Sequence, residues 1–448
     1  MWTVISGSWA LLLGILLLML GNGMQSTLLG VRGAIEGFSP AELSVVMSAY
    51  FAGFLLGSRT APLMIRRVGH VRVFAALGSF ISAILVLFPT MPDPVAWTVM
   101  RVVIGFSFAG VYVVAESWLN DGATNETRGQ ALSLYVIVQM AGIIAAQGLL
   151  VLGDPADFIL FIIPSVLVSL AFAPILLSVS PAPVFATTKP MTLRALYGVS
   201  PLGLVGSFLM GGVFAATYAM AAVFGTEAGL SVAQISLFVA TIYIGGLVCL
   251  YPIGWLSDRI DRRVLIAALA GGCALVMAWA VVGAGSFTVL LAIAFVIGGV
   301  SNPLYALFIA YTNDFLEPSD MAAASGGLIF ANGLGAVAGP LLLGWLMNVY
   351  GAAAFFGYVG VILAVLSAYA VWRMTRRPTP SSEETYSYTA VAPLGSVVAI
   401  ETAQEATLET MREDADAAEE AAAAQEAASD EAAAEAAAGA PDGTSSQR

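Results

Sequence analysis

The stretch Ser39-Pro-Ala-Glu-Leu-Ser44 recurs in altered form as Ser231-Val-Ala-Gln-Ile-Ser236, 192 residues further along the chain. Each copy opens an apolar run of the length that an α-helix needs to cross a bilayer, about 20 residues. The same offset, 192 or 193 residues, aligns Gly53 with Gly245, Ile104-Gly105 with Ile297-Gly298, and Asn120-Asp121 with Asn313-Asp314. The repeat predicts two similar halves of six membrane spans each, facing each other.

The composition agrees with a protein dissolved in lipid. Hydrophobic residues make up 59% of the 448 residues and charged residues 10%, whereas a soluble domain carries about 25% charged residues. We therefore predict an all-α membrane protein with 12 transmembrane helices in two pseudo-symmetric six-helix bundles, with the lipid bilayer as its solvent. The predicted spans lie near residues 9–30, 42–65, 72–92, 95–119, 130–152, 157–179, 201–224, 233–256, 264–284, 286–313, 322–348 and 352–373.

The distribution of charge divides the chain further. Residues 1–377 contain 15 Lys and Arg against 14 Asp and Glu, whereas residues 378–448 contain 2 against 15. The acidity therefore belongs to the tail and does not indicate a nucleic-acid partner. We predict an N-terminal bundle (1–179), a cytoplasmic linker (180–200), a C-terminal bundle (201–377) and an acidic, Ala/Glu-rich, disordered cytoplasmic tail (378–448).

Basic residues predict the orientation, because Lys and Arg concentrate in cytoplasmic connections. One set of alternate connections, with the segment after the last span, holds twelve of them, and the other set holds only Arg32. We expect a bacterial cytoplasmic membrane protein with both termini inside. The twelve residues are Arg66, Arg67, Arg72, Arg128, Lys189, Arg194, Arg259, Arg262, Arg263, Arg373, Arg376 and Arg377.

The chain lacks the residue patterns that enzymes and metal sites need. Its two cysteines, Cys249 and Cys273, lie in apolar runs, and His70 is its only histidine. Neither paired carboxylates nor a nucleophile–base set occurs at plausible spacing. We expect no enzyme activity, no metal and no cofactor.

A charged motif follows the eighth predicted span: Gly254-Trp-Leu-Ser-Asp258-Arg259-Ile-Asp261-Arg262-Arg263. A carboxylate at a helix end beside several guanidinium groups can form a charge-assisted latch between neighbouring helices. The alternative is that these charges only anchor the helix end. The motif resembles the loop signature of the major facilitator superfamily, Gly-x-x-x-Asp-Arg-x-Gly-Arg-Arg, with Asp261 in place of the second Gly. This resemblance implies a secondary transporter that rocks one bundle against the other.

The first half carries a degraded copy, in which Arg66 stands where the family has its Asp. The missing carboxylate could come from Glu116 or Asp121. The run from Arg67 to Arg72, the segment from Arg101 to Glu116-Ser-Trp-Leu, and Glu126-Thr-Arg-Gly129 resemble the YcaD-like branch of bacterial transporters, which implies no particular substrate. The expected latch residues of this half are Arg66, Arg67, Gly69, Arg72, Asp121 and Arg128.

Arg101 lies about six residues inside the fourth predicted span, where a charge costs a few kcal/mol. Its counterpart in the second half is Ala294, so the repeated scaffold does not require it. In the resembling family, an Arg-x-x-x-Gly motif in this span is linked to proton coupling or anion binding, and Arg101-Val-Val-Ile-Gly105 matches it. The alternative is that the side chain only reaches the headgroups. Glu116 in the same span could carry a proton or form a structural pair.

Polar residues at mid-span depth are candidates for a substrate site, although each could also hydrogen-bond a neighbouring helix. The candidates are Asn22, Gln25, Tyr50, Gln139, Tyr218, Tyr243, Asn302, Tyr305 and Asn332. We expect a monomeric secondary active transporter for a small polar or anionic solute, with protons as a candidate coupling ion. The alternatives are a multidrug or metabolite efflux pump and a non-transporting receptor or scaffold that uses the acidic tail.

Overall fold

The computed structural model describes most of the two predicted halves and a few residues of the tail. Side chains are described from residue 8 onward. The described residues are 2–124, 127–177, 191–283, 285–376, 388, 398–400, 402–405, 423 and 425.

Helices joined by short turns and loops make up the described chain, and 12 of these helices are long and apolar enough to cross a membrane, which confirms the predicted spans. The helices are α1 (Trp2–Ile35), α2 (Pro40–Val68), α3 (His70–Leu87), the short 3₁₀ helix η1 (Phe88–Thr90), α4 (Pro94–Gly122), α5 (Arg128–Leu150), α6 (Ile159–Leu177), α7 (Leu193–Val199), α8 (Pro201–Glu227), α9 (Val232–Ser257), α10 (Arg262–Gly283), α11 (Phe287–Asn313), α12 (Pro318–Tyr350) and α13 (Ala354–Met374).

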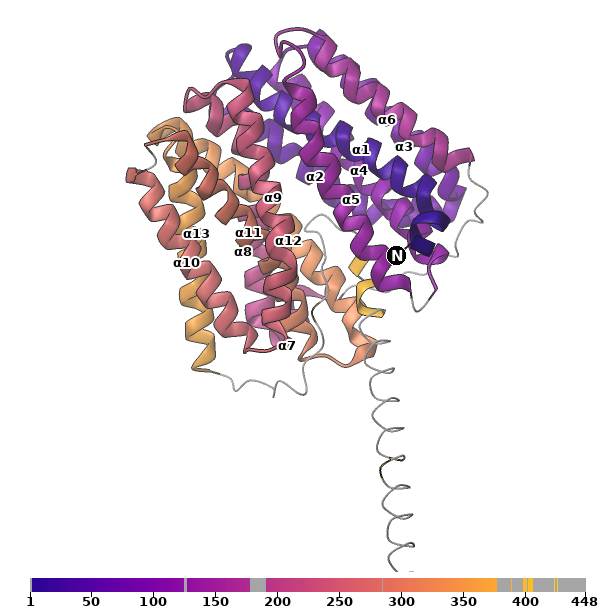
Figure 1. The fold of residues 1–448 in the computed structure, drawn as a ribbon, viewed down its shortest axis with the longest axis vertical. Coiled ribbons are helices and arrows are strands. Elements are labelled where there is room, and N and C mark those ends of the chain that lie inside the picture. The colour runs from indigo at the N-terminus through magenta and orange to yellow at the C-terminus, as the bar shows by residue number, and fades with distance from the viewer. Residues whose placement is uncertain are drawn as a thin grey trace, which may run out of the picture.

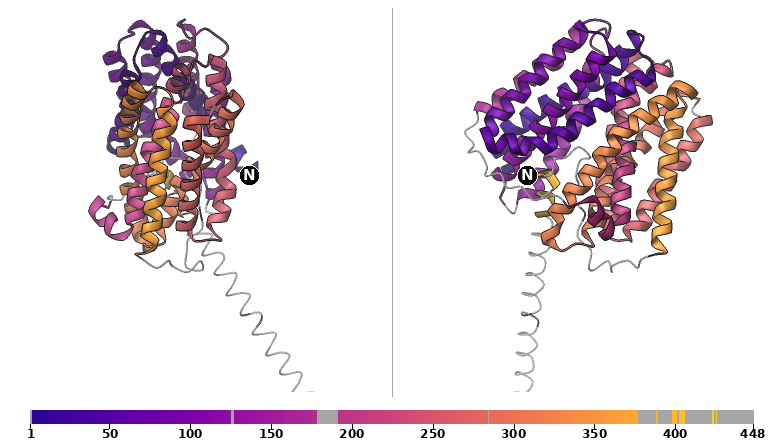
Figure 2. Two further views of the ribbon diagram at one scale, coloured as in Figure 1. Left: turned by 90° about the vertical axis from the view of Figure 1, so that its left-hand side faces the viewer. Right: turned by 180° about the vertical axis from the view of Figure 1, so that it is seen from behind.

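The helices form two bundles, α1–α6 and α8–α13, as the sequence repeat predicted (Figure 1). The short helix α7 lies in the linker between them. The bundles are inclined to each other and diverge toward the end where α2, α4, α9 and α11 finish (Figures 1 and 2). We call this the arginine-rich end, because Arg66, Arg128 and Arg262 lie there.

The bundles touch at the other end, which we call the opposite end. The backbone of Gly30 in α1 packs against Ala222 in α8, and Gly344 in α12 packs against Ser44 in α2. In the same interface, the Ser48 hydroxyl donates a hydrogen bond of 2.5 Å to the Val337 carbonyl oxygen. The molecule is therefore packed shut between the bundles at the opposite end.

The repeat extends to individual backbone contacts. A Cβ atom at Gly105 in α4 would overlap the Tyr50 carbonyl oxygen in α2, and one at Gly298 in α11 would overlap the Ile242 carbonyl oxygen in α9. Glycine at these positions lets two helix backbones touch, which is the main way that helices pack closely in lipid. Both members of each pair are related by the offset of 192 or 193 residues, so the two bundles share one internal design.

The repeated stretches that open α2 and α9 both form capping boxes. The Ser39 hydroxyl accepts the Glu42 backbone N–H at 3.2 Å, while the Glu42 carboxylate accepts the Ser39 N–H at 2.8 Å. Ser231 and Gln234 make the equivalent bonds at 3.3 and 2.9 Å. These bonds satisfy backbone donors at the helix start, and they explain why the serine and the Glu or Gln recur three residues apart.

One short part of the tail is described by the structure. Residues 398–400 and 402–405 are helical, and Ile400 is fully buried. Val398, Ala399, Ile400 and Ala403 supply a short apolar face just before the Ala/Glu-rich sequence, which lies outside the described residues apart from single positions. The order or disorder of the rest of the tail stays a prediction.

We predict that Gly105→Ala and Gly298→Ala destabilise the protein equally, because each added methyl group meets a backbone carbonyl that cannot move aside. Overpacking of this kind costs about 1–3 kcal/mol. Gly148→Ala in α5 is the matched control, because its Cβ meets open space and alanine favours helix. Thermal denaturation in detergent should show lower midpoints for the first two variants only; an unchanged midpoint for either contradicts the shared packing design.

Candidate substrate cavity and charged latch

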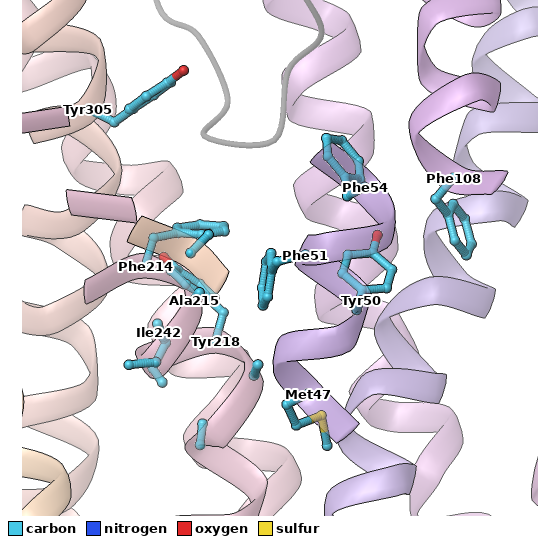
Figure 3. Packing of buried hydrophobic residues seen from close by; sticks show 14 of the residues in the cluster. Met47, Tyr50, Phe51, Phe54, Phe108, Phe214, Ala215, Tyr218, Ile242 and Tyr305 are labelled. Atoms are coloured by element: carbon cyan, nitrogen blue, oxygen red, sulfur yellow. The ribbon is translucent and has the colours of Figure 1, made fainter. Parts of the chain in front are cut away.

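A cavity of about 90 Å³ lies between the two bundles. Helices α1, α2, α4 and α5 line it from one bundle, and α8, α9 and α11 from the other. Figure 3 shows Phe51 of α2 facing Phe214 and Tyr218 of α8 across this region. Its lining residues are Met19, Asn22, Gly23, Ser26, Tyr50, Phe51, Arg101, Tyr112, Gln139, Met140, Ile143, Phe214, Tyr218, Ala219, Tyr243 and Asn302.

Arg101 is the charged residue of this cavity, and none of the described residues that line it is Asp or Glu. Its side chain is 1% exposed. The guanidinium carbon lies 4.6 Å from the centre of the Tyr50 ring, and Nη2 lies 3.7 Å from the Met47 sulfur. Its Nε and Nη1 groups have no hydrogen-bond partner among the described residues. The cavity therefore holds a buried positive charge with unused donors.

Each bundle contributes one amide that a tyrosine orients. The Asn22 amide nitrogen donates to the Tyr112 hydroxyl at 3.2 Å, joining α1 to α4. The Asn302 amide nitrogen donates to the Tyr218 hydroxyl at 3.0 Å, joining α11 to α8. Because each amide keeps its carbonyl oxygen for other partners, the cavity offers acceptors from both bundles beside the donors of Arg101.

The structure gathers most of the predicted polar residues around the cavity. Asn22, Tyr50, Arg101, Gln139, Tyr218, Tyr243 and Asn302 line it. Gln25, Glu116, Tyr305 and Asn332 do not belong to its lining.

The residues outside the lining have other surroundings. The Asn332 amide donates to the Ser207 carbonyl oxygen at 3.2 Å and so joins α12 to α8. Glu116, which is 2% exposed, accepts a hydrogen bond of 2.9 Å from the Tyr135 hydroxyl in α5. Gln25 and Tyr305 are buried, and their side-chain polar atoms have no hydrogen-bond partner in the described part of the chain.

Sequence reasoning missed Tyr112, although a signal was available. Tyr112 follows Arg101 by 11 residues, which is about three helical turns, so both side chains lie on the same face of α4. The apolar lining residues, such as Phe51, Met140 and Phe214, carried no such signal, because nothing in their sequence separates them from ordinary core residues.

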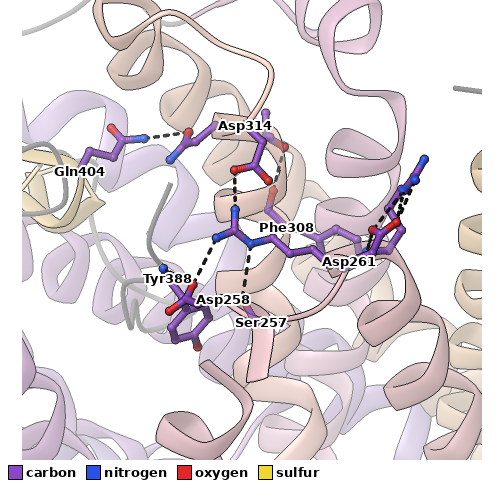
Figure 4. Close-up of polar contacts among 11 residues, drawn as sticks. Ser257, Asp258, Asp261, Phe308, Asp314, Tyr388 and Gln404 are labelled. Carbon is purple, nitrogen blue, oxygen red and sulfur yellow. Dashed lines mark hydrogen bonds and ion pairs between the residues drawn. The ribbon is translucent and has the colours of Figure 1, made fainter. Parts of the chain in front are cut away.

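The charged motif after α9 forms a cluster inside the second bundle (Figure 4). The Arg262 guanidinium lies 2.5 Å from the Asp314 carboxylate and 3.4 Å from that of Asp258. It also donates to the Ser257 hydroxyl at 3.4 Å. The side chains of Arg262 and Asp314 are only 3% and 4% exposed. This cluster ties the ends of α9 and α11 to the start of α10.

Asp314 was not among the predicted latch residues, although its repeat counterpart Asp121 was. Of the other predicted members, Arg263 pairs with Asp261 at 2.9 Å, and Arg259 stacks on Trp255 at 4.0 Å. Gly254 packs against Tyr388 of the tail.

The first-half copy has a different arrangement. Asp121, Arg67 and Arg72 make no ion pair with one another in the part of the chain that the structure describes. Gly69 links α2 to α3 with a φ of 86°, a conformation that favours glycine. Arg128 pairs with Glu405 of the tail at 3.2 Å.

The fold and cavity define a multi-pass helical membrane protein with a central cavity between its two bundles, in which a buried arginine and several polar side chains lie among apolar ones. The sequence profile of the Major Facilitator Superfamily matches residues 11–231 and 202–404. The chain belongs to the Major Facilitator Superfamily, and it is a membrane transporter of that family.

Two relatives and two solved structures describe its place in the family. An "uncharacterized MFS-type transporter" of Enterobacter sp. (strain 638) is 26% identical over 381 residues, which are 83% of this chain and 96% of that protein. The MFS-type transporter YcaD of Escherichia fergusonii is 24% identical over 349 residues, 76% of this chain and 88% of that one. The chain therefore resembles the YcaD-like transporters, as its motifs indicated.

The solved structures agree in fold. The nucleoside transporter NupG superposes with a TM-score of 0.65 at 15% identity, over 83% of this chain and 98% of that one. The E. coli fucose:proton symporter FucP superposes with a TM-score of 0.53 at 13% identity, over 83% of this chain and 99% of that one.

We predict that Arg262→Ala strongly destabilises the protein, because it leaves the Asp314 carboxylate buried without its partner. Removing one member of a buried pair costs about 3–5 kcal/mol. Arg259→Ala is the control, since Arg259 is exposed and stacks on Trp255. Thermal denaturation in detergent should separate the two variants, and Arg262→Met with Asp314→Leu should recover most of the loss. Equal midpoints for the two single variants would refute the buried cluster.

Proposed function

We propose that this protein is a secondary active transporter that binds a small polar or anionic solute in the central cavity and moves it by alternating access. The observation that carries the proposal is the buried Arg101 guanidinium with two donor groups unused. A buried charge without a partner is unfavourable by several kcal/mol. An anionic group of a solute would remove that cost and accept both donors.

The arrangement of the cavity supports a solute that carries both an anionic group and hydrogen-bonding groups. The residues Asn22, Asn302 and Gln139 line the same chamber as Arg101, and each has an amide that can accept or donate hydrogen bonds. Since the lining residues come from both bundles, a bound solute would contact both at once. Relative motion of the bundles would then change its access from one side of the membrane to the other.

The direction of closure supports an inward-facing state. We place the arginine-rich end in the cytoplasm, together with both termini, because basic residues concentrate in cytoplasmic connections. The packed contacts at the opposite end, such as Ser48 with Val337, would then close the chamber to the outside. We further propose that the monomer is the working unit, since one chain supplies both halves of the cavity.

Export of cationic drugs is a weaker alternative for this cavity. A cationic solute would meet the Arg101 charge with no carboxylate in the described lining to offset it. Repulsion between like charges is strongest in a buried, low-dielectric site. The cavity chemistry therefore favours anions over lipophilic cations.

We predict that small organic anions raise the thermal midpoint of the purified protein, because an anion that binds at Arg101 stabilises the folded protein. A panel of mono- and dicarboxylates, sugar phosphates and uncharged analogues tests this. Arg101→Gln should abolish the shift for every anion that gives one. Arg376→Gln is the control, because it removes the same charge from an exposed position beyond α13. An anion shift that survives in Arg101→Gln would remove Arg101 from the site.

We also propose protons as the coupling ion, with Glu116 as their carrier. The Glu116 carboxyl is buried inside a span and accepts a hydrogen bond from the Tyr135 hydroxyl of a neighbouring helix, and ionisable groups at such positions commonly belong to proton pathways. For an anion identified by the stability panel, a pH gradient should drive its accumulation in proteoliposomes. Glu116→Gln should lose this gradient dependence while it retains anion exchange at equal pH, and Glu36→Gln, in the opposite-end loop, should keep both. Gradient-driven uptake in Glu116→Gln would exclude the carrier role.

A further inference from the structure

A short piece of the C-terminal tail lies between the two bundles at the arginine-rich end (Figures 1 and 2). It consists of the described residues 398–400 and 402–405, which we call the wedge. Its apolar residues are shielded, with Ile400 0% and Ala403 2% exposed. The wedge is therefore docked onto the protein body, and it begins 24 residues beyond the end of α13.

The wedge contacts the C-terminal bundle through Gln404. The Gln404 amide nitrogen donates to the Ser325 hydroxyl at 2.7 Å and to the side-chain amide oxygen of Asn313 at 3.2 Å (Figure 4). The Met321 carbonyl oxygen lies 3.4 Å from the same nitrogen. Gln404 is 7% exposed, so these acceptors at the ends of α11 and α12 replace water around a buried amide.

The next residue contacts the N-terminal bundle. The Glu405 carboxylate lies 3.2 Å from the Arg128 guanidinium at the start of α5. Gln404 and Glu405, which are consecutive in the wedge, thus contact helices of opposite bundles. The wedge occupies the space into which those helix ends would have to move for the arginine-rich end to close.

A second tail contact reaches the charged latch. The Tyr388 backbone N–H donates to the Asp258 carboxylate at 2.8 Å, through the same oxygen that lies 3.4 Å from Arg262 (Figure 4). The Tyr388 ring packs against Gly254, where a Cβ would overlap it. Burial, with the Asp258 carboxylate nearby, raises the pKa of the Tyr388 phenol, so this residue docks as a neutral group.

We propose that the wedge is an intramolecular regulator that holds the transporter open at the arginine-rich end and must leave before the alternate state can form. The inference rests on the proposed alternating-access motion and does not depend on the solute. Because the wedge belongs to the same chain as the bundles, its docking is intramolecular and its local concentration is high. The acidic tail is also attracted to the basic connections at this end. Weak individual contacts are therefore sufficient for docking.

Docking is tested by cysteine labelling of the full chain in membranes, with Cys249 and Cys273 replaced by alanine. Ala403→Cys places a thiol in the buried wedge, and Gln425→Cys places one at an exposed tail residue. N-ethylmaleimide should label the first several-fold more slowly than the second. Adding Gln404→Ala or Ile400→Asp should remove that protection, whereas adding Gln425→Ala to the Ala403→Cys chain should not. Equal labelling of the two cysteines in the otherwise intact tail would overturn the proposal.

The effect on the bundles is tested by spin labels at Thr124→Cys and Asp320→Cys, two exposed positions on opposite bundles at the arginine-rich end. Gln404→Ala should add a population with a shorter distance between the labels, because the helix ends can approach each other. Gln425→Ala should leave the distance distribution unchanged. Gln404→Ala could release the wedge, as shown by loss of labelling protection at Ala403→Cys, and yet leave the distance distribution unchanged. That result would show a tail that docks without affecting the bundles, and it would overturn the regulatory role. Neither measurement requires a solute, so failure of the transport proposal would be seen separately, as loss of anion-dependent stabilisation.

Discussion

Direct contact between helix backbones at glycine is the constraint on which the rest of the structure depends. Apolar side chains gain little by leaving lipid for a protein interior, so helices in a membrane associate mainly through close packing. Gly105 against Tyr50, and Gly298 against Ile242, bring helix pairs of each bundle into such contact. Because these contacts tolerate almost no displacement, each bundle is expected to move as a unit. The freedom that remains is between the bundles, where the cavity lies.

The two halves share a scaffold but divide the chemistry. Arg101 in the first half corresponds to Ala294 in the second, and both are buried, so the scaffold accepts either residue. The second half instead holds the buried cluster of Arg262 with Asp314, whereas the first half has Arg66 in place of the motif's carboxylate. The first bundle thus carries the charged residue that lines the cavity, and the second carries a buried ion-pair cluster at its arginine-rich end.

The fold was predictable because its signals are local and repeated. Apolar length marks the spans, and the Ser39 and Ser231 capping boxes mark two helix starts in the same register. The polar part of the cavity was largely predictable too, since a buried amide or guanidinium in a span needs a partner. Its apolar part was not, because Phe51 or Phe214 could equally face lipid or another helix. Asp314 was missed since its partner, Arg262, is 52 residues away in the sequence, and only the repeat relates it to Asp121.

The tail could not be read from composition, because docking there depends on a few residues within a long acidic segment. Val398, Ile400 and Gln404 differ little from their surroundings in sequence, yet they meet an apolar surface and matched acceptors. Thermodynamic linkage then connects the wedge to the cavity. If the wedge binds only the state open at the arginine-rich end, any solute that binds the alternate state more tightly must also weaken the wedge by the same factor. The apparent affinity for such a solute decreases as the fraction of molecules without a docked wedge decreases. A modification or partner that captures the tail would therefore raise transport without touching Arg101 or the cavity.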